Sequence, residues 1–124
     1  MSLRRLEILQ WVGLLLGALV WTGQHVVGYG VTEAACSPGG THWGIRTDTW
    51  EAVLMAAAAG CVLAAGLAAV TVVVRTREES YESPPPTGRV RFLAIAAITA
   101  NLIFLVIILL DGLGSIFNVA CRQG

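Results

Sequence analysis

Three long apolar runs, separated by short polar connections, constrain this chain more than any other feature of its sequence. They span about residues 8–31, 50–74 and 92–119. Each is longer than the roughly 20 residues that a helix needs to cross a hydrocarbon core of ~30 Å. Only 13% of the 124 residues are charged, against about 25% in soluble domains, and the three runs lack charge almost entirely. Lipid is therefore the natural solvent of these segments.

In lipid, a segment that crosses the membrane once satisfies its backbone hydrogen bonds only as a helix. We therefore predict an all-α integral membrane protein, a bundle of three transmembrane helices in a single membrane domain, residues 1–124. The helices are joined by an outer loop, 32–49, and a second loop, 75–91, that contains the run Pro84-Pro85-Pro86.

The arginine residues set the expected orientation, since all eight basic residues are Arg. Six of them flank the first run or the second loop, whereas two lie in the first loop and after the third run. The positive-inside rule places the side with more basic residues in the cytoplasm. We predict a cytoplasmic N-terminus and Pro-rich loop 75–91, with the loop 32–49 and the C-terminus outside. The six are Arg4, Arg5, Arg75, Arg77, Arg89 and Arg91, and the two are Arg46 and Arg122.

Small residues recur at helical spacing in the first two runs. Gly13 and Gly17 form a GxxxG pair, and Gly60 and Ala64 belong to a row with four-residue spacing. Such rows let helix backbones approach closely, so we expect these four residues to pack helices inside this bundle. A motif for an outside partner is the alternative. Asn101, in the third run, is expected to make a hydrogen bond between helices.

His25 and Asp111 lie inside the apolar runs, where ionisable residues are costly unless they are paired or solvated. We interpret His25 as a hydrogen-bonded structural histidine. A haem or copper ligand is the alternative, because imidazole is the commonest metal ligand. We interpret Asp111 as an interfacial, solvated carboxylate, with a role in a proton path as the alternative.

The three cysteines differ in their expected surroundings. Cys36 and Cys121 follow runs that end on the same, external side, where oxidising conditions favour disulfides. Cys61 lies in the middle of the second run, where a free thiol behaves as a small apolar group. We predict a Cys36–Cys121 disulfide, and an external copper site that uses both thiols is the alternative.

The sequence contains no GxSxG, Walker, HExxH or CxxC motif, and it lacks the CxxCH pattern that attaches haem covalently. A net charge of zero and the lack of a basic stripe argue against nucleic acid as a partner. We predict a non-catalytic protein without a cofactor, although haem or copper stays an open alternative. Its expected partners are the lipid bilayer and a larger membrane-protein complex, with no nucleic acid.

Several short patterns carry a resemblance to a known group. They are Gly17-Ala18-Leu19-Val20-Trp21, then His25, Gly28-Tyr29-Gly30, Ala35-Cys36 and Ile116-Phe117-Asn118-Val119-Ala120-Cys121. Together they resemble the small, uncharacterised three-helix membrane proteins that bacteria encode beside haem-copper cytochrome c oxidases. That group has a Gly-rich start, a His in the outer part of helix one with a Cys after it, and a long third helix that ends near a second Cys.

The resemblance covers most of the chain and implies that His25, Cys36 and Cys121 are its notable positions. The function we expect is that of an accessory subunit or assembly helper of a bacterial respiratory membrane complex, with a haem-copper cytochrome oxidase as a candidate. The expected location is the bacterial plasma (inner) membrane. One alternative is a redox or metal carrier that uses His25 or the outer cysteines. Another is a small transport component that works as an oligomer, with Asp111 and Asn101 lining a path.

Overall fold

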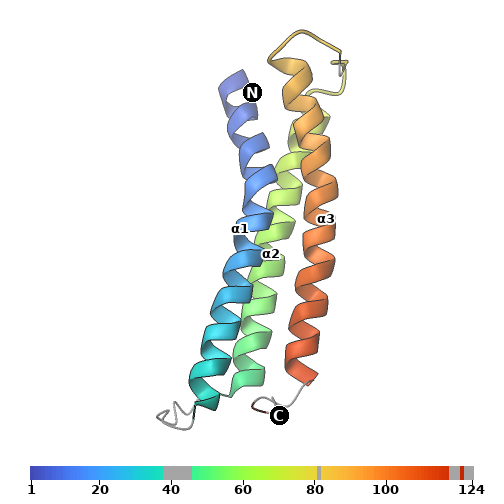
Figure 1. Ribbon diagram of the computed structural model, residues 1–124. Coiled ribbons are helices and arrows are strands. Elements are labelled where there is room, and N and C mark those ends of the chain that lie inside the picture. Colours follow the sequence, from blue (N-terminus) through green and yellow to red (C-terminus); the bar gives the residue numbers. More distant parts are fainter. Residues whose placement is uncertain (38–45, 81, 118–120, 122–124) are drawn as a thin grey trace.

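Three long helices account for nearly all of the described chain (Figure 1). The computed structural model describes residues 1–37, 46–80, 82–117 and 121. Helix α1 spans Leu3–Cys36, α2 spans Thr47–Arg75 and α3 spans Thr87–Phe117. The described residues contain no strand, and each helix is long and apolar enough to cross a membrane. This confirms the predicted all-α class and the three apolar helices, whereas residues 118–119 of the third run lie outside the described part.

The helices extend beyond the apolar runs that predicted them. α1 has 34 residues, and at ~1.5 Å per residue it is about 50 Å long, well beyond a hydrocarbon core of ~30 Å. Adding a residue to an existing helix costs little compared with starting one, so the polar ends continue the helix. The apolar runs therefore mark the part of each helix that suits lipid, and they do not mark its ends.

The three helices lie side by side, and α2 runs antiparallel to both α1 and α3 (Figure 1). The N-terminus and the α2–α3 connection lie at one end of the bundle, which we call the N-terminal end. The opposite end carries Cys36 and Cys121, and we call it the disulfide end. The two parallel helices thus bring their last turns to the same end.

Buried positions on each helix recur mostly at spacings of three and four residues, which is the pattern of left-handed helix packing. Mostly small or apolar side chains fill the resulting core, and a few polar groups interrupt it. In α1 the buried positions are Leu6, Gln10, Gly13, Gly17, Gln24 and Gly28; in α2 they are Glu51, Ala58, Val62, Ala65, Ala69 and Val72. In α3 they are Gly88, Val90, Ala94, Ala97, Asn101, Ile108 and Gly112.

Arginine side chains tie the helices together at the N-terminal end. Arg91 of α3 donates hydrogen bonds to the carbonyl oxygens of Val73, at 3.4 Å, and of Thr76. The last carbonyls of a helix have no partner within it, and a cation there also interacts favourably with the helix dipole. Arg89 forms an ion pair with Glu7 of α1, with an N–O distance of 3.6 Å. Both contacts fix the start of α3 against its neighbours.

Gly13 and Gly17 lie where the helices approach each other closely. A Cβ added to Gly13 would lie 3.0 Å from the Cβ of Ala69 and 3.2 Å from the carbonyl oxygen of Ala65. A Cβ added to Gly17 would meet the side-chain oxygen of Asn101. Only glycine leaves room for these contacts, so the GxxxG pair packs α1 against both α2 and α3.

The expectation that Gly60 and Ala64 pack inside the bundle is wrong. Both residues are exposed, and a Cβ added to Gly60 would have nothing within 4 Å. The buried stripe of α2 runs instead through Ala58, Val62 and Ala65, on a different face of the helix. Small residues permit a close approach on any face that carries them, and α2 carries alanine on several. Val62 on this stripe belongs to one hydrophobic cluster with Ile108 of α3, and Val20 of α1 packs against that cluster.

Candidate functional site

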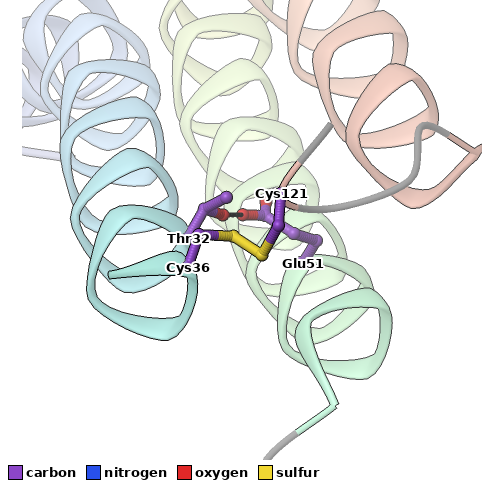
Figure 2. Close-up of a disulfide and its surroundings, with 4 residues drawn as sticks. All are labelled: Thr32, Cys36, Glu51 and Cys121. Atoms are coloured by element: carbon purple, nitrogen blue, oxygen red, sulfur yellow. Dashed lines mark hydrogen bonds between the residues drawn. A yellow bond between two sulfur atoms is a disulfide. The ribbon is translucent and has the colours of Figure 1, made fainter. Parts of the chain in front are cut away.

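A disulfide joins Cys36, the last residue of α1, to Cys121, which follows α3 (Figure 2). The two Cα atoms are 5.2 Å apart, which lies within the usual range for a disulfide. The predicted pairing is thereby confirmed. Because both sulfur atoms are used in this bond, neither is a thiolate, which is the form in which cysteine binds a metal. Cys61 is a free cysteine on the exposed surface of the bundle.

Glu51 is buried just below the disulfide, between α1 and α2 (Figure 2). Its exposed fraction is 7%, and the hydroxyl of Thr32 donates a hydrogen bond to its Oε1 atom at 3.4 Å. A Cβ added to Gly28 would lie 3.0 Å and 3.1 Å from the two carboxylate oxygens. The carboxylate therefore occupies the space that a side chain at position 28 would take.

The signal for Glu51 is its spacing from the buried stripe of α2, and the sequence alone does not show which face of that helix is buried. Glu51 precedes Ala58 by seven residues, which places it on the same buried stripe as Ala58, Val62 and Ala65. Thr32, its hydrogen-bond donor, also lines an open pocket of about 260 Å³ beside the disulfide. Thr32 thus lies between the surface at the disulfide end and the buried carboxylate.

His25 of α1 lies beside Asp111 of α3, with 3.4 Å between the imidazole Nδ1 and the carboxylate Oδ2. The two side chains are 60% and 37% exposed, so the pair is on the outer surface of the bundle. The ring of Trp21 lies 6.2 Å from the ring of His25 and 5.9 Å from that of Phe104. His25 is hydrogen-bonded, as we interpreted it, and its partner is Asp111, for which the sequence had indicated no side-chain partner.

Asn101 and Asp111 occupy different surroundings on α3. Asn101 is 4% exposed, and its amide donates to the carbonyl oxygens of Gly13 and Ala97. This is the predicted bond between helices. Asp111 instead faces the surface beside His25. The two residues therefore do not line one path within a single bundle.

The described residues contain no group of three or more His, Cys, Asp or Glu side chains arranged to hold a metal ion. The neighbour of His25 is the carboxylate of Asp111, and the disulfide sulfurs belong to a separate part of the bundle. His42, which follows α1 in the sequence, lies outside the described residues. The structure therefore does not bring His25 together with the cysteines that were the other candidate ligands.

The fold and the site define a class: a small multi-pass membrane protein of three long apolar helices, with a disulfide at one end and polar residues just below it. Comparison with protein-family models, with curated proteins and with solved structures gives no match for the chain. Its function is therefore inferred from its own residues.

Proposed function

We propose that this protein is a non-catalytic accessory subunit or assembly helper of a larger membrane-protein complex in a bacterial plasma (inner) membrane. One observation carries the proposal: the His25–Asp111 pair is exposed on the bundle surface although both residues belong to apolar runs. Charged and polar groups in transmembrane segments almost always face other protein or a water-filled cavity. A single bundle leaves this pair facing lipid, and a neighbouring protein would cover it.

The exposed face of α2 adds support. Gly60 and Ala64 leave a shallow row on the outside of the bundle, with open space around Gly60. Rows of small residues let another transmembrane helix approach closely. This agrees with the alternative reading of these residues, in which their spacing serves an outside partner. The chain thus has two surfaces, on different helices, that suit contact with other membrane helices.

We further propose that the complex is respiratory and that a haem-copper cytochrome oxidase is the first candidate. The support is the resemblance carried by His25, Cys36 and Cys121. In this role the disulfide would hold the outer ends of α1 and α3 together and keep the His25–Asp111 surface in one shape for its partner. A disulfide at that end is consistent with the predicted external C-terminus, because disulfides form in oxidising compartments.

A second candidate function is that of a small transport component that works as an oligomer. It is favoured by the presence of two carboxylates, Glu51 and Asp111, in long apolar helices, since such residues often mark ion or proton pathways. Inside a single bundle, the side chain of Asn101 is packed against Gly13 and Gly17 of α1. A path would therefore have to run between copies of the chain.

The test is native purification from bacterial membranes in a mild detergent, followed by measurement of the mass of the particle and its optical spectrum. We expect the protein to migrate with a larger complex that contains other polypeptides and shows haem absorption. The His25→Gln variant should leave that absorption unchanged, because the haem belongs to the partner. Migration as a monomer or as a homo-oligomer would contradict the proposal. A haem band that disappears in His25→Gln would support the redox carrier instead.

A further inference from the structure

Six residues of α1 and α3 form one surface at the level of His25. Thr22 and Tyr29 lie three residues before and four after His25, so they share its side of α1. Ile107 and Gly114 lie four residues before and three after Asp111, so they share its side of α3. All six residues are exposed or half-buried. We call this surface the α1/α3 face, and it consists of Thr22, His25, Tyr29, Ile107, Asp111 and Gly114.

Asp111 contributes the one formal charge of the α1/α3 face, since the formal count at pH 7 takes histidine as neutral. His25 lies about 9 Å inside the end of the apolar run 8–31, at ~1.5 Å per residue. At that depth an anion facing lipid is costly, and lipid headgroups lie nearer the surface. A cation or a strong donor on a neighbouring helix would remove this cost.

No other copy of this chain can supply an arginine or a lysine from a membrane-spanning segment. All eight basic residues are arginines, and every one lies outside the three apolar runs. The arginine described at the disulfide end, Arg46, lies before α2 and pairs with Asp48 at 2.7 Å. A homo-oligomer would therefore bring a further Asp111 into the membrane without a basic residue at the same depth. An arginine or lysine at this depth would therefore have to come from a different polypeptide.

We propose that the α1/α3 face docks a transmembrane helix of a different protein, and that this helix carries an arginine or lysine paired with Asp111. Gly114 adds no side chain to this face, and small residues let another transmembrane helix approach closely. Tyr29, which is 61% exposed, adds an aromatic ring of the kind enriched in interface cores. The inference rests on the proposed function, since it names the partner chemistry of the same surface.

The experiment uses the purified full chain in lipid vesicles with a synthetic transmembrane peptide. One peptide is a leucine helix of about 20 residues with a single arginine about 9 Å from one end, the depth of His25. The other is the same helix without arginine. Association is measured by energy transfer between dyes on the peptide and on the protein. We expect the arginine peptide to bind about ten-fold more tightly than the leucine peptide, as one interhelical contact of about 1.4 kcal/mol allows.

The variant Asp111→Asn should remove the preference for arginine, whereas the matched variant Thr99→Ala, also on α3, should retain it. Equal binding of the two peptides to the native chain would overturn the inference. So would a preference that persists in Asp111→Asn.

A second measurement separates this inference from the proposed function. A photo-crosslinking amino acid replaces Thr22 in the α1/α3 face, or Leu63 on the outer face of α2, in cells. We expect position 22 to cross-link to a transmembrane peptide of another protein that contains Arg or Lys near the linked residue. A cross-linked segment without a basic residue would end the inference and leave the accessory role standing. Cross-links from both positions to copies of this chain alone would end both proposals.

Discussion

The side-chain amide nitrogen of Asn101 on α3 lies 2.6 Å from the backbone carbonyl oxygen of Gly13 on α1 and donates a hydrogen bond to it. The same nitrogen donates to the carbonyl oxygen of Ala97 at 2.8 Å. The bond to α1 depends on glycine, because a Cβ at Gly17 would meet the Asn101 side chain. The hydrogen bond between α1 and α3 therefore depends on the close packing of these two helices.

Gly17→Leu should destabilise the bundle, because a leucine there would clash with Asn101 and Phe104. We expect a loss of about 1–3 kcal/mol, as for other overpacked cores, measured by unfolding in mixed detergent. Gly60→Leu is the matched control, since its added side chain meets open space. That variant should change stability by no more than about 0.5 kcal/mol. The opposite ranking would mean that the described α1–α3 interface is wrong.

Asn101→Ala should lower stability by about 1 kcal/mol, which is typical of a hydrogen bond between membrane helices. Stability falls because the carbonyl oxygen of Gly13 would lose the hydrogen bond that Asn101 donates to it. Thr99→Ala is a suitable control, since the hydroxyl of Thr99 bonds within its own helix to the carbonyl of Ile95. Equal effects of the two variants in the same unfolding assay would show that the bond between helices contributes little.

The disulfide predicts the pattern of thiol alkylation. Under denaturing, non-reducing conditions, mass spectrometry should find only Cys61 alkylated, because Cys36 and Cys121 are bonded to each other. Reduction should expose both. Cys36→Ser should lower stability by at most about 4–5 kcal/mol, given the sequence separation of 85 residues and the entropy of closing so long a loop. Alkylation of all three cysteines before reduction would contradict the bond and revive an external copper site.

The arginine distribution predicts the orientation in the membrane. A reporter enzyme that works only outside the cytoplasm should be active when fused after Gly124, and inactive when fused at the N-terminus. The reason is the six-to-two division of arginines between the two sides and the preference of basic residues for the cytoplasmic side. A fusion within the loop 75–91 provides the control, and it should behave like the N-terminal fusion. If the loop fusion were active, the orientation would be the reverse of the predicted one.

Much of the fold was determined by the sequence alone. Three apolar runs far longer than a soluble core requires leave the helix as the way to satisfy the backbone in lipid, so the number and approximate position of the helices follow directly. Cys36 and Cys121 could be paired because an even number of apolar runs lies between them, which leaves both at the same end of the bundle. The GxxxG pair in α1 predicted a close approach of helices, since small residues at this spacing let two backbones come near each other.

Only the tertiary structure decided how each helix is rotated about its axis. In α2, alanine and glycine occur on several faces, so spacing alone favoured Gly60 and Ala64, whereas the buried stripe runs through Ala58 and Val62. Which face is buried depends on how side chains from all three helices fill the space between them. The same rotation placed Glu51 against Gly28 and set His25 beside Asp111. These contacts join distant parts of the chain, and no local pattern in the sequence encodes them.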